Sequence, residues 1–359
     1  MGKCFVTKLD GSSNNPELLR LGEIRMKILK VQEPTDHTQG FSIGFNKSAT
    51  LEIVSDGYFT DKTLTENKGK RITLDAGVNS SIWVNGSNDV EIAILDKYSL
   101  TYMAGNYIQD SSPYWDNIEF NISDLKHSTS LTSLNLYNTQ TSGNISDLKN
   151  LTSLTSLSLY NTKTSGNISD LKNFTSLTSL NLANTQTSGN ISDLKNLTSL
   201  TSLNLANTQT SGNISDLKNL TSLTSLSLYN TKMPLIGDIG ELSALSKCTE
   251  MIFMHSKLTG DLATLPASCR FVSFANDKGS TFTWSTRLST AKIIAVEGNA
   301  SITNIDKMLQ DQSQCQKGFD ASSSVKYKTI SCSGTRTSAS DAAVATLQSK
   351  GYTVSIIPA

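Results

Sequence analysis

The chain has 359 residues, of which 17% are charged, and its 31 lysines and arginines balance 31 aspartates and glutamates. This length allows two or three domains or one extended repeat structure, and the even charge gives no reason to expect nucleic acid or an anionic membrane as a partner. The opening MGKCFVTKLDGSSNN lacks the apolar run of a secretory signal, and no later stretch is long enough to span a bilayer. We therefore expect no membrane insertion and no export through a signal peptide.

Residues 1–118 contain no repeat and are predicted to form an N-terminal β-rich domain. Short apolar runs alternate there with clusters of Gly, Asn and Asp, which is the pattern of short strands joined by turns. The stretch 90–102 alternates and then acquires leucine-rich spacing, so the last strand of this domain is expected to begin the sheet that follows. The predicted strands are 4–8, 24–31, 49–54, 71–74 and 81–84.

Residues 120–232 form five consecutive turns with a fixed period of 23 residues, the signature of a solenoid. The second turn reads GNISDLKNLTSLTSLSLYNTKTS. Its last two aliphatic residues are two apart, as one face of a strand requires, while the others are three apart, which suits a 3₁₀-like convex arc. One strand per turn predicts a parallel sheet that is stable only when turns stack. The aliphatic positions are Ile145, Leu148, Leu151, Leu154, Leu157 and Leu159.

The segment LTSLTSLSLYNTKTSGNI resembles the plant-type leucine-rich repeat, L-x-x-L-x-x-L-x-L-x-x-N-x-L-[ST]-G-x-I. The resemblance implies a leucine-rich repeat solenoid, which we place at 119–277. Thr162 stands where that pattern has its ladder asparagine, and Thr164 stands where it has a leucine. A threonine hydroxyl can bond the backbone of the neighbouring turn, so we expect the threonines to replace the ladder, although Asn161 lies one residue away. The threonine column is Thr139, Thr162, Thr185, Thr208 and Thr231.

Residues 278–359 are predicted to contain diverged repeats and a C-terminal cap. The period slips near Pro234, after which apolar residues restore the pattern. Strands are expected at 271–274, 293–296, 329–331 and 352–357. Helices are expected at 304–312 and at 339–350, the latter opened by Ser340 and Asp341 and closed by Gly351.

The two ends of the chain carry a second resemblance. CFVTKLDG, LGEIRMKI, TQGFSIGF and DGYFTDKTLTENKGK at the start, and KTISCSGTRTSASDAAVATLQSKGYTVSI at the end, resemble leucine-rich repeat proteins of bacteriophages and prophages of gut Bacteroidales. This resemblance implies a virion protein of tail-fibre or adhesin type. Its N-terminal domain would contact other virion proteins, its solenoid would face the host, and a homo-oligomer is compatible with the pattern.

The sequence offers no catalytic constellation, no metal site and no cofactor site. The three histidines lie far apart, and no G-x-S-x-G elbow or phosphate loop occurs. Asp147 and its equivalents recur once per turn beside a lysine, which is typical of a solvated convex edge, so a glycan hydrolase remains a third hypothesis without residues to support it. Five cysteines without a C-x-x-C pair argue against a disulfide framework, and Cys248 and Cys269 are expected to be buried.

The near-identical turns differ mainly at positions that a strand would turn toward the concave side. One column contains either Asn or Ser, the next either Tyr or Ala, and a third either Gln or Lys. We expect the tyrosines to be exposed and the columns to bind a host cell-surface glycan or protein. Two alternatives stay open: the differences could reflect recent duplication of a Ser-Tyr-Lys and an Asn-Ala-Gln copy, and the chain could be a purely structural virion decoration. The candidate binding residues are Asn135, Tyr137, Gln140, Ser158, Tyr160, Lys163, Asn181, Asn204, Ser227, Tyr229 and Lys232.

Overall fold

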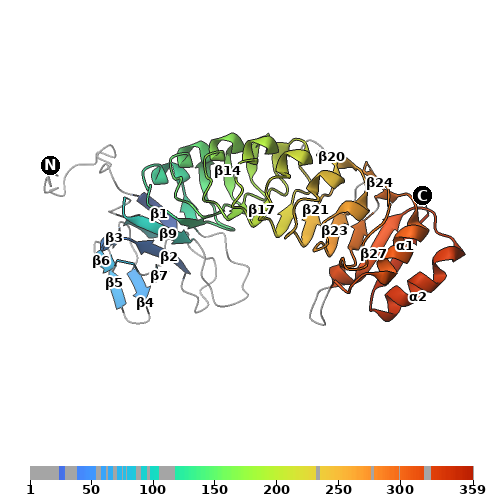
Figure 1. Ribbon diagram of the computed structural model, residues 1–359. Coiled ribbons are helices and arrows are strands. Elements are labelled where there is room, and N and C mark those ends of the chain that lie inside the picture. The colour runs from blue at the N-terminus through green and yellow to red at the C-terminus, as the bar shows by residue number, and fades with distance from the viewer. Residues whose placement is uncertain are drawn as a thin grey trace, which may run out of the picture.

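A computed structural model describes residues 24–28, 39–53, 58–61, 64–67, 71–74, 76–77, 79–85, 90–94, 98–104, 118–231, 235–275, 279–298, 300–318 and 325–358. The molecule is an elongated arc with a β-rich part at the N-terminal end, a solenoid in the middle and a mixed cap at the C-terminal end (Figure 1). The repeat strands line the inner side of the arc, and short 3₁₀ helices line its outer side.

The N-terminal part contains two sheets. One has five antiparallel strands in the order β10-β1-β8-β3-β6, and the other, β9-β2-β7-β4-β5, is the antiparallel end of a 13-stranded sheet. The prediction at 71–74 coincides with β6, three others overlap β1, β3 and β7, and 4–8 lies outside the described residues. The strands are β1 Ile24–Ile28, β2 Gln39–Phe45, β3 Ala49–Ile53, β4 Tyr58–Asp61, β5 Leu64–Asn67, β6 Arg71–Leu74, β7 Asn79–Asn85, β8 Val90–Ile94, β9 Leu100–Ala104 and β10 Ile118–Phe120.

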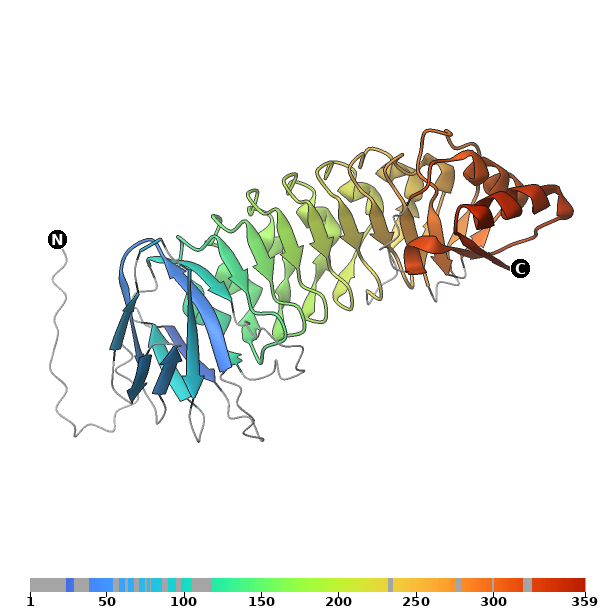
Figure 2. The ribbon, with the colours of Figure 1, turned by 90° about the horizontal axis from the view of Figure 1, so that it is seen from below.

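The 13-stranded sheet continues without interruption from this part into the solenoid. Strand β9 pairs in parallel with β11, so that Met103 lies beside Leu134, as the leucine-rich spacing after residue 90 had predicted. From there each turn adds one parallel strand in the same register, and the leucines form one buried column (Figure 2). The strands are β11 Ser133–Asn135, β13 Ser156–Ser158, β15 Ser179–Asn181, β17 Ser202–Asn204, β19 Ser225–Ser227, β21 Glu250–Ile252, β23 Phe271–Phe274 and β25 Ala295–Gly298.

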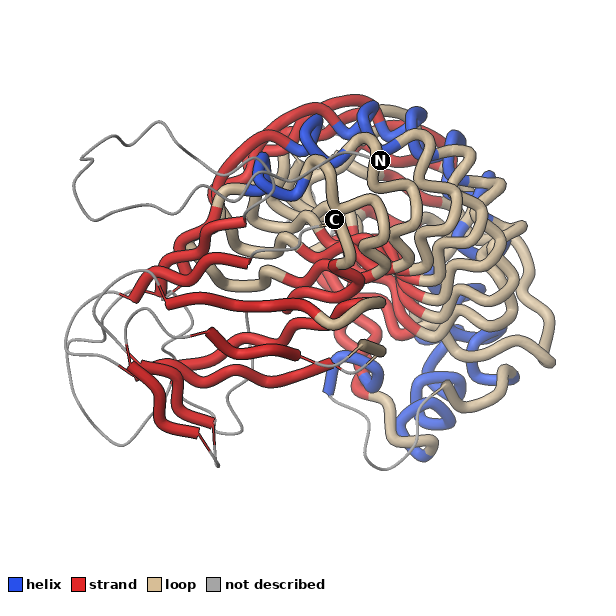
Figure 3. Tube along the Cα trace, turned by 90° about the vertical axis from the view of Figure 1, so that its left-hand side faces the viewer, coloured by secondary structure: helices blue, strands red, loops and turns tan. Residues whose placement is uncertain are grey.

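After its inner strand, each turn bends and forms a second strand that the sequence did not predict. In the first five turns an asparagine bends the chain, with Asn161 at φ 53°, because asparagine tolerates the left-handed conformation; in the next turn His255 takes this place at φ 57°. The second strands form a four-stranded parallel sheet, β12-β14-β16-β18, continued by the parallel pair β20-β22, and together they cover a flank of the solenoid (Figure 3). They are β12 Ser142–Asn144, β14 Lys163–Asn167, β16 Gln186–Asn190, β18 Gln209–Ser211, β20 Ile236–Asp238 and β22 Lys257–Thr259.

The convex side follows the predicted three-residue spacing. In each turn an asparagine or aspartate caps a 3₁₀ helix, as when Asn144 Oδ1 accepts a hydrogen bond of 2.9 Å from Ser146 N. Isoleucine and leucine of the helix are fully buried. These helices are η1 Ile122–Leu125, η2 Ile145–Leu148, η3 Ile168–Leu171, η4 Ile191–Leu194, η5 Ile214–Leu217, η6 Ile239–Leu242 and η7 Leu262–Thr264.

The predicted threonine ladder is wrong. Thr162 Oγ1 donates to Leu159 O of its own turn at 2.7 Å and pairs with the Thr164 hydroxyl, so it never reaches the next turn. The ladder is made by the asparagines at the bends, where Asn161 Nδ2 donates to Asn138 Oδ1 at 2.9 Å. The two side chains differ in length. The asparagine side chain extends from the left-handed bend to the equivalent asparagine of the neighbouring turn, whereas the shorter threonine hydroxyl bonds to the carbonyl three residues earlier in its own turn. A second ladder, which the sequence did not predict, joins Thr132, Thr155, Thr178, Thr201, Thr224 and Thr249, each hydroxyl donating to a backbone carbonyl of the preceding turn.

The C-terminal cap adds two α-helices and a small parallel sheet with the order β24-β26-β27-β28. Both predicted helices are confirmed within two residues at either end, and the predicted strands at 271–274, 329–331 and 352–357 overlap β23, β27 and β28. The cap consists of β24 Thr281–Phe282, β26 Ser301–Ile302, α1 Ile305–Gln314, η8 Val325–Lys328, β27 Thr329–Ser333, η9 Ser338–Ser340, α2 Asp341–Ser349 and β28 Thr353–Ile357.

Candidate functional site

The candidate site is the solvent-facing side of the repeat sheet on the inner side of the arc, which we call the concave face. Side chains alternate along a strand, so the residues on either side of each buried leucine point to this face. The parallel register aligns them in columns from β11 to β19. Besides the threonine ladder and the asparagines of the bends, the columns are Ser133, Ser156, Ser179, Ser202 and Ser225; Asn135, Ser158, Asn181, Asn204 and Ser227; and Tyr137, Tyr160, Ala183, Ala206 and Tyr229.

The serine column differs from the adjacent threonine ladder in its hydrogen bonding. The threonine hydroxyls are occupied by backbone carbonyls, as in the bond of 3.0 Å from Thr155 Oγ1 to Thr132 O. Within the part of the chain that the structure describes, no protein group is bonded to the hydroxyls of Ser156, Ser179 or Ser202. These half-buried serines therefore offer donors and acceptors that the fold does not use.

The next column combines a structural role with free donors. Asn135 Oδ1 accepts a hydrogen bond of 3.2 Å from Tyr137 N, and Asn181 and Asn204 make the equivalent bond at 3.1 Å. These bonds fix the amide with its oxygen toward the backbone and its Nδ2 group away from it. Ser158 is half-buried, while Ser227 is buried with 8% of its surface exposed. The asparagines thus present N–H donors in a fixed orientation.

Two of the three tyrosines stack on each other. The ring centroids of Tyr137 and Tyr160 are 4.7 Å apart and their planes differ by 13°. The prediction that these rings lie side by side is confirmed, but the prediction that Tyr137, Tyr160 and Tyr229 are exposed is wrong, because all three are half-buried. Adjacent parallel strands bring equivalent side chains about 4.8 Å apart, so each stacked ring covers part of its neighbour. Ala183 and Ala206, at the same position, are buried.

The Gln and Lys column does not belong to the concave face. Lys163 is the first residue of β14, beyond the left-handed bend at Asn161, and its side chain is exposed on the flank of the solenoid. Gln140 lies beyond the equivalent bend at Asn138, and Lys232 lies outside the described residues. The sequence placed these residues beside the tyrosines because it gave no sign of the second sheet. The structure brings together the Asn, Ser and Tyr columns only.

The C-terminal segment η8 closes the concave face at one end. The serine column continues by register into Glu250 and Phe271, and Tyr327 of η8 covers both: its hydroxyl donates to Glu250 Oε2 at 2.7 Å, and its ring meets Phe271 edge-on at 5.4 Å. Arg270 lies 4.9 Å from the centroid of the same ring. No sequence pattern links residues 77 positions apart, so this contact was not foreseen. The open part of the concave face therefore ends at β19.

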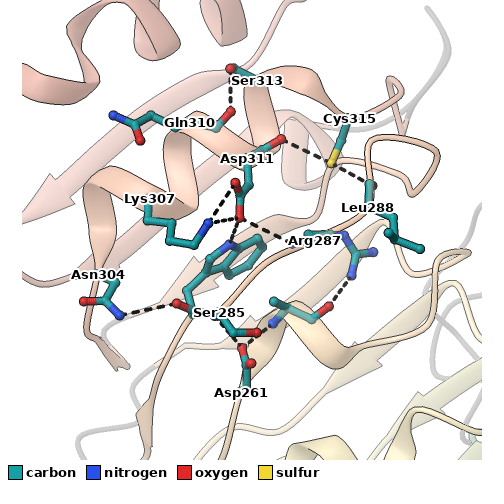
Figure 4. A network of polar contacts seen from close by, with 12 residues as sticks. Asp261, Ser285, Arg287, Leu288, Asn304, Lys307, Gln310, Asp311, Ser313 and Cys315 are labelled. Atoms are coloured by element: carbon teal, nitrogen blue, oxygen red, sulfur yellow. Dashed lines mark hydrogen bonds and ion pairs between the residues drawn. The ribbon is translucent and has the colours of Figure 1, made fainter.

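A second polar cluster lies in the cap and is structural (Figure 4). Asp311 of α1 accepts hydrogen bonds from Trp284 Nε1 at 3.0 Å and from Arg287 N at 3.3 Å, and pairs with Lys307. The Arg287 guanidinium is buried and donates to backbone carbonyls, including Leu265 O at 2.9 Å and Pro266 O at 3.0 Å. Burial lowers the pKa of Arg287. With its donors directed at carbonyl oxygens, the Arg287 guanidinium joins the last turns to the cap.

Neither a metal centre nor a membrane helix emerges from the ranges that the structure describes. No three His, Cys, Asp or Glu side chains in those ranges gather into a metal-binding group. None of the helices described there has the length and apolar composition to cross a membrane. Cys248 and Cys269 are free thiols and buried, as predicted.

No family model matches the chain, and no curated protein matches it. Among solved structures it is similar to the leucine-rich repeat ectodomain of the plant membrane receptor kinase GASSHO1/SCHENGEN3 from Arabidopsis thaliana, with 22% identity, a TM-score of 0.46 and coverage of 66% of this chain and 28% of that one. It is also similar to a TDR receptor, with 20% identity, a TM-score of 0.49 and coverage of 66% and 40%.

A bacterial protein shows the same likeness over more of its own length. An internalin from Listeria monocytogenes is 17% identical, with a TM-score of 0.41 and coverage of 74% of this chain and 85% of that one. The chain spans less than half of the two receptor chains above. At these identities the likeness concerns the fold alone, and the repeat geometry establishes independently that this chain is a leucine-rich repeat solenoid.

Proposed function

We propose that this chain is a bacteriophage virion protein of tail-fibre or adhesin type, whose concave face recognises a ligand on the host cell surface. The proposal rests on where the near-identical turns differ. From the second turn to the fifth, the buried columns are copied apart from Phe174 in place of a leucine and Met233 in place of a threonine, whereas the Asn/Ser, Tyr/Ala and Gln/Lys columns vary. The Asn/Ser and Tyr/Ala columns lie on the concave face and the Gln/Lys column on the flank beside it, and a surface that varies over a nearly constant core is suited to discriminating ligands.

The virion assignment rests on the resemblance of both ends of the chain to phage and prophage proteins of gut Bacteroidales. On this reading the N-terminal sheets attach to other virion proteins, and the solenoid extends away from the particle. The elongated shape agrees with that division, because the β-rich part and the cap lie at opposite ends of the arc (Figure 1).

The alternative is a structural decoration that spaces or covers other virion subunits. The two functions predict different results when purified chain competes with phage particles for host cells. Purified full-length chain, added in excess to host cells before the particles, should occupy the host ligand and lower particle adsorption if the concave face recognises the host. A decoration should leave adsorption unchanged. Mass spectrometry of purified particles should detect the chain in either case, and its absence there would contradict the virion assignment.

A further inference from the structure

Among the residues that the structure describes, the concave face carries no charged side chain from β11 to β19. Its five columns contain only Thr, Ser, Asn, Tyr and Ala in all five turns, whereas 17% of the whole chain is charged. The turns are near copies, so the informative positions are those where they differ. On the concave face the differences exchange Asn for Ser and Tyr for Ala, which keeps the face neutral, while the column beyond the bend exchanges Gln186 for Lys163. The column beyond the bend therefore carries a lysine in the second and fifth turns, while the columns of the concave face stay neutral in all five.

The same face carries a repeated set of hydrogen-bonding groups that the protein leaves unused. Serine hydroxyls such as Ser179 Oγ can both donate and accept, and Asn181 Nδ2 donates, its oxygen being bonded to Ala183 N at 3.1 Å. The serine hydroxyl recurs in every turn at the strand spacing of about 4.8 Å along the solenoid axis, whereas the asparagine amide recurs in the first, third and fourth turns and is replaced by Ser158 and Ser227 in the others. A ligand that fits this array carries hydroxyl groups at a similar spacing along its own length.

The tyrosines add apolar contact area to this polar array. Tyr137 and Tyr160 stand together at the N-terminal end of the face, and Tyr229 stands near the other end. The exposed part of each half-buried ring offers aromatic carbon next to a phenolic hydroxyl, which suits a ligand whose surface alternates C–H groups with hydroxyls.

We propose that the ligand of the concave face is a neutral glycan chain that lies along the solenoid axis over β11–β19; this rests on the proposed function. One pyranose unit is comparable in length with one strand spacing, so consecutive sugars meet equivalent serine hydroxyls and, in the first, third and fourth turns, an asparagine amide. Protein partners are typically held by aromatic and arginine anchors among apolar pockets and charges. Among the described residues of the concave face from β11 to β19 there is no arginine or tryptophan, and the only aliphatic side chains are the buried Ala183 and Ala206. An anionic glycan would find no cation among the described residues of this face.

The test uses the purified full-length chain and host cells treated in two ways. Sodium periodate cleaves the vicinal diols of sugars, and proteinase K removes surface protein. Binding should fall at least tenfold on periodate-treated cells and persist on protease-treated cells. Loss of binding on protease-treated cells alone would overturn the glycan assignment while leaving host recognition intact. Absence of binding to untreated cells would contradict host recognition itself.

Charge is tested by competition and by a pair of matched variants. Host surface polysaccharide can be separated on an anion-exchange column into an unbound neutral fraction and a retained anionic fraction. The neutral fraction should compete with host cells for binding of the chain. Competition by the anionic fraction alone would contradict the proposal that the ligand is neutral. Ser179→Asp places a charge at the centre of the face and should lower binding at least tenfold. Gln186→Glu places the same charge seven residues later on the flank and should leave binding unchanged. Equal effects of the two variants, with circular dichroism showing both folded, would contradict the assignment of the site to this face.

Discussion

Replacing Gly189 with alanine tests how the turns are held together. Gly189 has φ +119°, a conformation that L-residues rarely adopt, and an added Cβ would overlap Asn167 Oδ1 of the preceding turn and come within 3.0 Å of Ile168 Cγ1. The backbone strain costs about 1–3 kcal/mol. Displacing Asn167 also breaks its cap on η3, the 2.9 Å bond from Ser169 N, at a cost of about 1 kcal/mol. The two effects predict a loss of about 2–4 kcal/mol in the stability of the central turns.

The measurement is native-state hydrogen exchange of the backbone amides in these turns, which reports local stability in a chain whose turns need not unfold together. Asn167→Ala alone removes the cap without strain, and the double variant Asn167→Ala/Gly189→Ala removes the clash as well. We expect the loss of stability in the double variant to be about 1 kcal/mol smaller than the sum of the losses in the two single variants. Strict additivity would refute the idea that glycine is required here to make room for the asparagine.

Three further predictions concern the core. Leu180→Asp should unfold the central solenoid, because the position is fully buried and a carboxylate there has no partner; an unchanged melting curve would contradict the buried leucine column. Ser128→Ala should raise the melting temperature, since Ser128 Oγ is buried without a hydrogen-bond partner among the described residues and its desolvation costs about 1–3 kcal/mol. Cys248 should resist iodoacetamide at pH 8 until the protein is unfolded in urea, because burial raises the pKa of its thiol to about 12 and only the thiolate reacts; rapid native-state labelling seen by mass spectrometry would show that the thiol is accessible.

The sequence was sufficient to predict the inner strands, the 3₁₀ arcs and the two cap helices. A constant period makes each position of a turn visible several times, so Leu157 and its equivalents identify one buried column without ambiguity. The segments of helices α1 and α2 have a composition typical of helices, which was enough to predict both. Gly351, the predicted end of the second helix, lies two residues beyond the last residue of α2.

The second sheet was missed because its strands do not look like strands. The segment KTSGN of β14 contains glycine, serine and asparagine, residues that usually indicate a turn, and its pairing comes only from the stacking of neighbouring turns. Without that sheet, Lys163 could not be placed correctly. The contact of Tyr327 with Glu250 was missed for a different reason, because it joins distant segments that share no periodic pattern.

The continuity of the sheet also bears on the boundary predicted at residue 118. Because β9 supplies the strand next to β11, truncation at 118 removes the neighbour of Leu134 and exposes the edge of the repeat sheet. Particle attachment by the N-terminal part is therefore better tested with a truncation before residue 98 that keeps β9.

The most direct test of recognition by the concave face is host-cell binding by the double variant Tyr137→Ala/Tyr160→Ala. The third and fourth turns already carry alanine at this position, and Ala183 and Ala206 are accommodated there with intact strands β15 and β17. The variant should therefore remain folded by circular dichroism while losing the stacked rings, and its binding to host cells should fall at least tenfold relative to the parent. Binding equal to that of the parent by the folded variant would contradict the account and favour a structural decoration of the particle.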